Sequence, residues 1–538
     1  MKVLVTERIA KEGIEILKNE GIEVDEKIGL SHEEICNIIG GYDALIVRSA
    51  TKVNEEMIKC GKNLKVIARA GVGIDNVDVE AATKQGIIVV NAPDGNIMAA
   101  AELTLGLIFS IFRYIPQAYM SCKQGDFRRN KFKGVELYEK TAGIIGFGKI
   151  GALVAERLKA CGMRVIAYDP YVSDEKFKKY GVEKVDFETL LKESDLITIH
   201  TPKTPETYNL ISEKEFKKMK KGVRIVNCAR GGVINEKDLY NAIKEGIVAA
   251  AALDVLEKEP NFELEKQDYY NPLLELDNVV ITPHLGASTQ EAQVNVAVSV
   301  AKEVAAVLKG GIAKNAVNLP AFEKEKLDEI LPYLELAEAM GKIFIQAERA
   351  FAKKIEIIYS GQIDEKMTTW LTRALLKGYL EFSVQDTVNY VNSQVLAQEQ
   401  GIEVIESKTH EGGKFKNMIT ARFTTDEKVL ELAGTVYNNE GRIIDFFGYK
   451  VDFKPEKYML LIQNIDKPGM IGKIGTIVGE YGINIATMQV SRNKKGEKAV
   501  MVCEIDGALP DEAVEKLKNT DGILRVTMAK LQKVAIKK

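Results

Sequence analysis

Three side chains that together could oxidise a hydroxy acid each stand a few residues past an apolar segment. They are Arg230, Glu259 and His284. Removing hydride from a 2-hydroxy acid requires a base for the hydroxyl proton, and histidine suits this role because its pKa lies near neutral pH. A neighbouring glutamate would fix the tautomer of the ring, and an arginine fork would grip the carboxylate in two places. The residue types therefore predict hydride-transfer chemistry if the fold brings the three loops together.

Each of these side chains also has an ordinary interpretation. His200 likewise follows an apolar segment, so it competes with His284 for the role of base. An acidic residue before a proline, such as Glu259, is commonly part of a turn. The three loops are far apart in the sequence, so only the fold can make them converge.

A glycine-rich segment supplies the other half of the chemistry, a hydride acceptor. Residues 141–151 place Gly-x-Gly-x-x-Gly between an apolar strand and a helix predicted over 150–160. These glycines allow a tight turn, a close approach to a pyrophosphate and close packing of helix on strand. The next predicted strand, 164–168, ends in an acidic residue that would accept both ribose hydroxyls and repel a 2'-phosphate, which favours NAD over NADP. The residues predicted to hold the cofactor here are Gly146, Gly148, Lys149, Ile150, Gly151 and Asp169.

Strands and helices alternate along the first half of the chain, which predicts an α/β fold with two doubly wound parallel sheets. The first set of predicted strands covers 2–7, 42–48, 64–69 and 86–91. The second set continues after Asp169 at 195–200, 224–228, 248–254 and 278–282. Ligands of such sheets bind beyond the carboxyl ends of the strands, which is where the candidate residues fall.

Two arginines follow strands of the first set. Arg48 and Arg69 are each an ordinary loop cation when taken alone, but small residues over 69–75 and 91–96 offer backbone N–H groups nearby. Together they predict a carboxylate or phosphate pocket. The basic run over 127–133, which contains Arg129, reads first as a solvated face because isolated surface charges contribute little.

Composition limits the remaining classes of function. A chain of 538 residues is too long for a single hydrophobic core, which predicts three or four domains. The net charge of −3 gives no electrostatic reason to expect binding to nucleic acid or to an anionic membrane. The six cysteines are scattered without a C-x-x-C pair, which is typical of a reducing compartment and predicts neither a structural zinc nor any other metal site. The chain begins with a predicted strand and shows no signal peptide, and the apolar run 98–111 reads as a buried helix. We therefore expect a cytoplasmic protein.

The last 220 residues carry no catalytic constellation. Residues 315–320 read as a linker, followed by a helix over 323–350, a strand over 354–360, a helix over 370–380 and alternating strands to about 451. His410 reads as a surface histidine. From 458 a βαββαβ pattern follows, which contains an Asp-x-Pro-Gly turn at the start of its first helix.

The motifs resemble those of the D-2-hydroxyacid dehydrogenases. The segments that carry the resemblance are the glycine motif with Asp169, His200-Thr-Pro, Asn227-Cys-Ala-Arg-Gly-Gly, Ala252-Leu-Asp-Val and Pro283-His-Leu-Gly-Ala-Ser. The resemblance implies that Arg230 holds the substrate carboxylate, His284 is the acid/base and Glu259 its partner. It places Arg48, Arg69 and Asn96 around the substrate, and Thr201, Cys228 and Asp254 with Asp169 around NAD. It also implies that the basic segment near Arg129 reaches the phosphate pocket of a neighbouring subunit.

The resemblance extends over essentially the whole chain and predicts four domains. They are a substrate-binding domain (1–95 and 285–316), an NAD-binding domain (96–284), an α+β intervening domain (317–453) and a ferredoxin-like domain (454–538). The last resembles an ACT domain, whose carboxylate and amides at Asn464, Asp466 and Asn484 would hold an amino-acid effector, L-serine. A dimerisation module without a ligand is the alternative, since a fold does not specify a function.

The activity implied by the resemblance is NAD-dependent oxidation of D-3-phosphoglycerate to 3-phosphohydroxypyruvate, the first step of phosphorylated L-serine synthesis, in a homo-oligomer of two or four chains. Two alternatives are open. One is a glyoxylate or hydroxypyruvate reductase on the same scaffold. The other is a non-catalytic protein that senses a dinucleotide.

Overall fold

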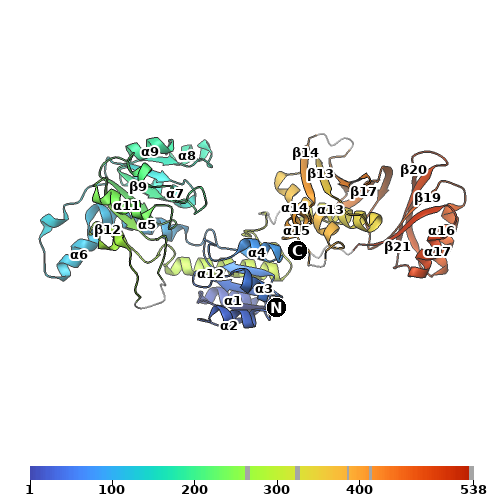
Figure 1. Ribbon diagram of the computed structural model, residues 1–538, viewed down its shortest axis with the longest axis horizontal. Coiled ribbons are helices and arrows are strands. Elements are labelled where there is room, and N and C mark those ends of the chain that lie inside the picture. The colour runs from blue at the N-terminus through green and yellow to red at the C-terminus, as the bar shows by residue number, and fades with distance from the viewer. Residues whose placement is uncertain (261–266, 321–326, 385–386, 411–414, 532–538) are drawn as a thin grey trace.

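The computed structural model describes residues 1–260, 267–320, 327–384, 387–410 and 415–531. The chain forms four lobes, numbered here in the order in which their sheets occur along the chain. In Figure 1 the first lobe lies at the bottom centre, the second on the left, the third on the upper right and the fourth on the far right. The two α/β lobes therefore lie together on one side of the molecule, and the two carboxyl-terminal lobes lie on the other.

The first lobe is a five-stranded parallel sheet with the order β2-β1-β3-β4-β5, covered by helices. Its strands are β1 (Lys2–Val5), β2 (Glu23–Glu26), β3 (Ala44–Val47), β4 (Val66–Arg69) and β5 (Ile88–Val90). Its helices are α1 (Lys11–Asn19), α2 (His32–Ile39), α3 (Glu55–Cys60) and α4 (Val79–Lys84), together with the later α12 (Gln290–Leu308), which packs on α1. The chain thus returns to this lobe after building the second.

The second lobe is a seven-stranded parallel sheet with the order β12-β11-β10-β9-β6-β7-β8. Counted within the lobe, this is the 3-2-1-4-5-6 order of dinucleotide-binding sheets with one strand added. The strands are β6 (Thr141–Ile145), β7 (Arg164–Tyr168), β8 (Glu183–Lys184), β9 (Leu196–Ile199), β10 (Val223–Asn227), β11 (Val248–Leu253) and β12 (Val279–Ile281). The helices are α5 (Ile97–Arg113), α6 (Ile115–Lys123), α7 (Lys149–Ala160), α8 (Asp174–Tyr180), α9 (Phe187–Glu193), α10 (Glu213–Phe216) and α11 (Glu236–Lys244), with 3-10 turns η1 (Arg129–Phe132) and η2 (Pro272–Glu275).

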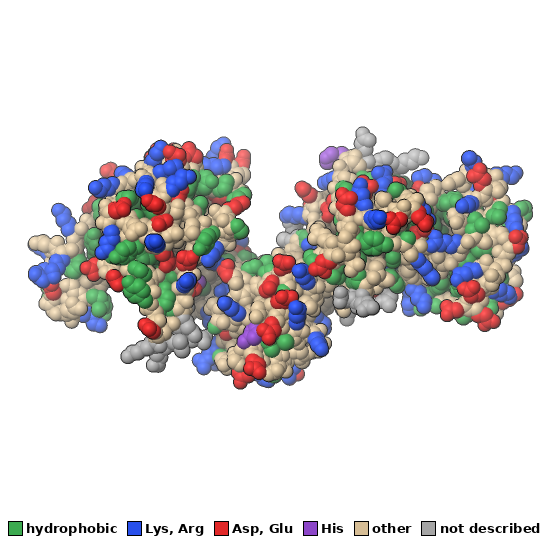
Figure 2. Space-filling view, viewed as in Figure 1, with side chains coloured by type: hydrophobic (Ala, Val, Ile, Leu, Met, Phe, Trp, Pro, Cys, Tyr) green, Lys and Arg blue, Asp and Glu red, His purple; other side chains and the backbone are tan. Residues whose placement is uncertain are grey.

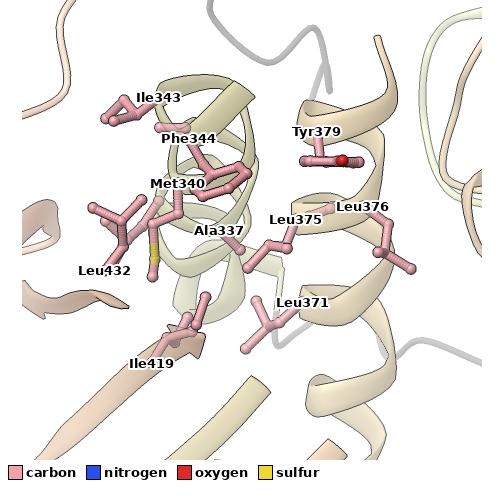
Figure 3. Close-up of a cluster of buried hydrophobic side chains, with 14 of the residues drawn as sticks. Ala337, Met340, Ile343, Phe344, Leu371, Leu375, Leu376, Tyr379, Ile419 and Leu432 are labelled. Carbon is pink, nitrogen blue, oxygen red and sulfur yellow. The ribbon is translucent and has the colours of Figure 1, made fainter. Parts of the chain in front are cut away.

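The third lobe packs helices on a six-stranded mixed sheet of order β14-β13-β15-β16-β17-β18. Its strands are β13 (Lys354–Gly361), β14 (Glu403–Thr409), β15 (Asn417–Thr424), β16 (Val429–Tyr437), β17 (Glu440–Phe446) and β18 (Tyr449–Phe453). Its helices are α13 (Leu327–Glu348), α14 (Glu365–Leu380) and α15 (Ser393–Glu399). Figure 3 shows the core, where Phe344 of α13 faces Tyr379 of α14, and Met340 of α13 lies beside Leu432 of the sheet.

The third lobe is fastened to the first at β5. Val317 donates its N–H to the Val89 carbonyl at 2.7 Å, and the Asn318 amide oxygen accepts the Val89 N–H at 2.9 Å. The Asn389 amide donates to the carbonyl of Gly86, in the turn before β5, at 2.8 Å. The linker thus contacts β5, and the third lobe contacts the turn that precedes it.

The fourth lobe is an antiparallel sheet of order β20-β21-β19-β22, the ferredoxin-like arrangement. Its elements are β19 (Tyr458–Ile465), α16 (Met470–Glu480), β20 (Ile485–Arg492), β21 (Lys498–Ile505), α17 (Asp511–Lys518) and β22 (Ile523–Lys530). Together with the two parallel sheets and the α+β third lobe, this confirms the predicted fold class.

The fourth lobe shares a core with the third. Leu460 and Ile462 on β19 pack under α16 and α17, whereas Met459 and Leu461 point the other way into the core of the third lobe. This alternation is that of a strand buried on both faces.

Glutamine side chains join the edges of the fourth-lobe sheet to the third lobe. Gln489 on β20 accepts the Asp452 N–H from β18 at 2.7 Å and donates to the Asp452 carbonyl. Gln346 on α13 accepts the Lys530 N–H from β22 at 2.9 Å and donates to its carbonyl at 3.2 Å. The amides thus satisfy backbone groups that an edge strand would leave open.

The apolar run predicted to be a buried helix forms α5, and Ala101, Ile108 and Phe112 in it are buried. Among the described helices, none alone is long and apolar enough to cross a membrane, and the pair α5 and α6, bent by 65°, meets the length and composition criteria only when taken together. Figure 2 shows acidic and basic side chains interspersed over the visible face of the molecule.

Candidate active site

The glycine loop joins β6 to α7. Gly146 has a φ of +89°, and a Cβ there would lie 2.7 Å from the His200 carbonyl oxygen. A Cβ on Gly151 would lie 2.2 Å from the Gly146 oxygen, so the turn excludes side chains at both positions. Gly148 is the N-cap of α7 and no side chain caps this helix, which leaves its first N–H groups for an anion.

Asp169, at the end of β7, lies against this loop. One carboxylate oxygen accepts the Phe147 N–H at 2.8 Å and the other accepts the Tyr171 N–H at 2.9 Å. The carboxylate is thereby fixed beside the glycine turn, where the ribose of a bound dinucleotide would lie. These residues fit the predicted NAD.

Two further residues were predicted around NAD, Thr201 after β9 and Cys228 after β10. The Thr201 hydroxyl is buried and has no hydrogen-bond partner in the described part of the chain, and its methyl group lies 2.9 Å from the Cβ position of Gly146. Burial raises the pKa of the Cys228 thiol to about 12, so this thiol is neutral at physiological pH. An unsatisfied buried hydroxyl calls for a partner such as a ligand.

His284 and Glu259 lie in contact. The Nδ1 of His284 is 2.9 Å from a carboxylate oxygen of Glu259, and both side chains are partly exposed. His284 has a φ of +55°, a left-handed conformation that is uncommon for a residue with a Cβ. Nε2 is therefore the ring nitrogen on the side away from Glu259.

Asp254 organises the loop that carries His284. Its carboxylate accepts hydrogen bonds from the Thr282 hydroxyl at 2.6 Å, the Leu285 N–H at 2.7 Å and the Gly286 N–H at 2.9 Å. Burial raises the pKa of Asp254, and these hydrogen bonds oppose the shift. Both oxygens therefore face the histidine loop, a role that the resemblance, which placed this residue around NAD, did not include.

The Arg230 side chain extends from the second lobe to a contact with the first. Its Nε faces a carboxylate oxygen of Asp75 at 3.2 Å, and its Nη1 donates to the Ala229 carbonyl at 2.7 Å. Asn227 holds the loop by donating to the Arg230 carbonyl at 2.9 Å and accepting the Ala229 N–H at 3.0 Å. Arg230 thus lies at the junction of the two α/β lobes.

Arg48 and Arg69 bring positive charge to the first-lobe side of this junction. Burial, followed by the charge of Arg230, lowers the pKa of Arg69 to about 10, and Arg48 adds a smaller effect of the same sign. The Nε of Arg69 and the amide oxygen of Asn96 are buried without a partner among the described residues. Crowded cations beside unsatisfied buried groups are typical of an anion site.

The sequence prediction did not include three carboxylates that lie at the junction. Glu7 accepts the N–H groups of Arg48, Ala50 and Thr51 at 2.8, 3.1 and 2.9 Å, which fixes the arginine loop. Asp94 pairs with Lys149, the first residue of α7, and Asp75 pairs with Arg230. The sequence signal for the first is a carboxylate shortly after β1. Asp75 and Asp94 stand in the segments 69–75 and 91–96, which pointed to an anion pocket only through their small residues and backbone N–H groups.

His200, the other candidate for the base, lies in a different environment from His284. Its Nε2 is 3.0 Å from the Thr198 hydroxyl, and burial lowers its pKa to about 4. A ring with so low a pKa is a weak proton acceptor at neutral pH, which favours His284 as the base.

The remaining predicted site residues lie apart from this junction. Arg129 is exposed in η1 and makes no ion pair within the described ranges, whereas its neighbours Arg128 and Lys131 both pair with Asp126. In the fourth lobe, the Asp466 carboxylate accepts from Arg492 at 2.7 Å and from the Gly496 N–H at 3.0 Å, which lowers its pKa.

The two asparagines predicted in the fourth lobe point to different partners. The buried Asn464 donates to the Ile465 carbonyl at 2.8 Å, and its amide oxygen has no partner in the described structure. The exposed Asn484 donates to Asp506 at 3.2 Å. Asp466 and Asn484 therefore share no partner in the described residues.

Three family models match successive parts of the chain. Residues 105–286 match the NAD-binding domain of D-isomer specific 2-hydroxyacid dehydrogenases, residues 329–447 match the D-3-phosphoglycerate dehydrogenase intervening domain, and residues 458–522 match the ACT domain. The matched ranges lie in the second, third and fourth lobes.

Several full-length proteins are similar to the chain. It is 46% identical to the D-3-phosphoglycerate dehydrogenase of Methanocaldococcus jannaschii over 99% of this chain and 100% of the relative. The enzymes of that name from Archaeoglobus fulgidus and Bacillus subtilis are 46% and 41% identical, over 99% and 98% of this chain and 100% and 99% of their own.

Solved structures match about three fifths of the chain. The TT0316 protein of Thermus thermophilus aligns with a TM-score of 0.54 at 32% identity, over 59% of this chain and all of its own. A D-lactate dehydrogenase of Aquifex aeolicus, solved with NAD and lactic acid, aligns with a TM-score of 0.53 at 30% identity, over 59% of this chain and 98% of its own.

Proposed function

The chain belongs to the D-3-phosphoglycerate dehydrogenase family, and we propose that it oxidises D-3-phosphoglycerate to 3-phosphohydroxypyruvate with NAD. This reaction opens a phosphorylated route to L-serine. The chain is an NAD-dependent oxidoreductase of the 2-hydroxyacid type, with a nucleotide-binding sheet and a glycine loop that fit the cofactor.

The proposed role of each residue follows from the contacts at the junction. His284 accepts the hydroxyl proton at Nε2, because Glu259 engages Nδ1. The Glu259 carboxylate stabilises the imidazolium that forms. Arg230 holds the substrate carboxylate. When bound, NAD supplies the nicotinamide ring that receives the hydride.

We propose that the other end of the substrate lies among Arg48, Arg69 and Asn96. A phosphate carries up to two negative charges, and an anion beside Arg69 would offset the burial and the neighbouring positive charges that lower the pKa of this arginine. The Asn96 amide is a polar group for a substrate oxygen. D-3-Phosphoglycerate, with a carboxylate and a phosphate, suits a site with cations on both lobes.

The observation that carries this proposal is the 2.9 Å contact of His284 with Glu259. The test is the initial rate of NADH formation from NAD and D-3-phosphoglycerate, beside D-lactate, D-glycerate and NADP controls. We expect activity on the phosphorylated acid with NAD. Faster reduction of glyoxylate or hydroxypyruvate would favour the reductase, and NAD binding without turnover of any 2-hydroxy acid would favour a sensing protein.

We further propose that the fourth lobe binds L-serine and thereby slows turnover, through Asn464, Asp466 and Asn484. The support is the match to the ACT domain and the unsatisfied amide oxygen of Asn464. The test is the same rate with millimolar L-serine, in the wild type and in an Asp466→Asn variant. Undiminished activity of the wild type in the presence of serine would indicate that the lobe serves assembly and not inhibition.

We propose that the chain acts as a homo-oligomer of two or four copies in the cytoplasm. The exposed Arg129 would then reach the phosphate of a substrate bound by a neighbouring copy. Light scattering measures the assembly, and Arg129→Ala should raise KM for D-3-phosphoglycerate without changing KM for NAD. An unchanged substrate KM would remove Arg129 from the site.

A further inference from the structure

Asp75 is a first-lobe carboxylate that pairs with the proposed carboxylate-binding arginine. It follows β4 in a loop of small residues, and its Oδ2 lies 3.2 Å from the Nε of Arg230 in the second lobe. The Asp75 side chain is 65% exposed and that of Arg230 is 27% exposed. The ion pair therefore spans the junction and remains open to water on the aspartate side.

The guanidinium of Arg230 has two edges that can grip a carboxylate in two places, Nε with Nη2 and Nη1 with Nη2. Asp75 faces Nε, and the Ala229 carbonyl accepts from Nη1 at 2.7 Å. A substrate carboxylate that binds through Nε and Nη2 would therefore displace Asp75, whereas Nη1 keeps a second N–H group besides the one that the Ala229 carbonyl accepts. The Ala229 carbonyl is fixed in the chain next to the arginine, whereas Asp75 is an exposed side chain on another lobe, so Asp75 is the one that can leave.

The loop that carries Asp75 is shaped around this contact. A Cβ added to Gly73 would lie 2.2 Å from the Nη2 of Arg230 and 2.9 Å from the Asp75 carboxylate. The missing side chain at position 73 lets guanidinium and carboxylate meet there. The contact therefore depends on the local sequence of the loop.

The charge of Asp75 also acts on the neighbouring arginines. Burial and the charges of Arg230 and Arg48 lower the pKa of Arg69, and the charge of Asp75 opposes them. Asp75 is thus a counter-ion for the arginine cluster as well as a partner of one member. A substrate carboxylate would bring the same charge to the same place.

We propose that Asp75 competes with the carboxylate of the substrate for Arg230, and thereby sets the affinity of the site for anionic substrates. This inference rests on the proposed function of Arg230. Asp75 is a positioning residue: it holds the guanidinium across the junction and gives it up when the acid binds. Removing its charge should tighten binding of the acid and leave the chemical step unchanged.

The test compares Asp75→Asn and Asp75→Ser with the wild type, with Glu80→Gln as a control. Glu80 is 81% exposed on α4 of the same lobe, so the control removes the same charge away from the junction. For exposed ion pairs we expect KM for D-3-phosphoglycerate to fall about two- to fivefold in both Asp75 variants, with kcat held within about twofold. The control should show neither change.

A second measurement does not depend on turnover. Calorimetric titration of the NAD-loaded protein with oxalate, a dicarboxylate that has no hydroxyl to oxidise, should show a fall in Kd of about two- to fivefold in both Asp75 variants. If the wild type oxidises no 2-hydroxy acid, the proposed function fails, and this titration still decides whether Asp75 competes. A rise in KM with a fall in kcat, or an unchanged oxalate Kd, would overturn the proposal.

Discussion

Lys342 donates to Glu338 at 2.7 Å in the core of the third lobe, where their side chains are only 3% and 2% exposed. Lys377 approaches the same carboxylate oxygen at 2.6 Å, and the Tyr390 hydroxyl donates to the other oxygen at 2.8 Å. Burial alone would raise the pKa of Glu338, but the two lysines bring it below its usual value. The lobe therefore contains a buried charge network in which two lysines balance one carboxylate.

Replacing Lys342 with Met should destabilise the third lobe by about 3 kcal/mol, because removing one partner leaves a buried charge without full compensation. Trp370, the single tryptophan of the chain, is buried in this lobe, so its fluorescence in a urea titration reports this unfolding. Lys353→Met is the matched control, since Lys353 pairs with Asp426 at an exposed site. A fluorescence midpoint equal to that of the control would contradict the prediction.

His284→Ala should lower kcat by roughly 10²–10⁴-fold, the range for a positioned general base. Glu259→Gln keeps an oxygen beside Nδ1 but removes the charge that stabilises the imidazolium, so its loss should be smaller. Steady-state kinetics with D-3-phosphoglycerate measures both, and the exposed His410→Ala is the control. Near-normal turnover of His284→Ala at neutral pH would remove this residue from the mechanism.

Asp169→Asn should raise the kcat/KM for NADP relative to NAD by about tenfold or more, because the repulsion of a 2'-phosphate is lost. Asparagine cannot accept both the Phe147 and the Tyr171 N–H with carboxylate oxygens, so the variant should also bind NAD less tightly. Asp174→Asn, an exposed change beside Lys184, is the control in competition kinetics. An unchanged cofactor preference would refute the role of Asp169.

His200 should make the second lobe less stable as the pH falls. Its pKa is about 4 in the fold against about 6.5 in an unfolded chain, so the unfolded state binds the proton first. The stability that its neutral form contributes is present above pH 6.5 and is lost as the pH falls toward 4, by about 2 kcal/mol at pH 5.

Proton NMR of the four histidine rings tests the His200 prediction directly, with His200→Gln for assignment. Hydrogen exchange of peptides covering β9, corrected for intrinsic rates, measures the loss of local stability. A ring that titrates near pH 6.5 would contradict the burial on which the prediction rests, and would restore His200 as a competitor of His284.

The parallel strands and the glycine loop could be read from the sequence because their signals are local. An apolar run followed by Gly146 and Gly151 specifies strand, turn and helix within a short window. The first-lobe strand β2 was missed because its sequence is Glu-Val-Asp-Glu, which contains no apolar run. The strand can be this polar because it lies at an edge of the sheet. The helix predicted over 323–350 begins at Leu327, and residues 323–326 lie outside the described structure.

The contacts across the junction could not be predicted in this way. Asp75 and Arg230 are distant in the chain and meet only because two separately folded sheets lie against each other. The role of Asp254 was missed for a related reason, since a carboxylate after a strand looks the same whether it faces a cofactor or the loop of His284. Residue type showed which groups could react, and tertiary packing decided what each one touches.

The core shared by the third and fourth lobes limits how this chain can change over evolutionary time. A recombination point in the short connection between Phe453 and Tyr458 would expose the apolar row of Met459 and Leu461 and leave Gln489 facing water. A fourth lobe acquired from another protein would need matching apolar side chains on the face of its sheet before it could pack against α13. The two lobes are therefore expected to be gained, lost and exchanged as one heritable unit.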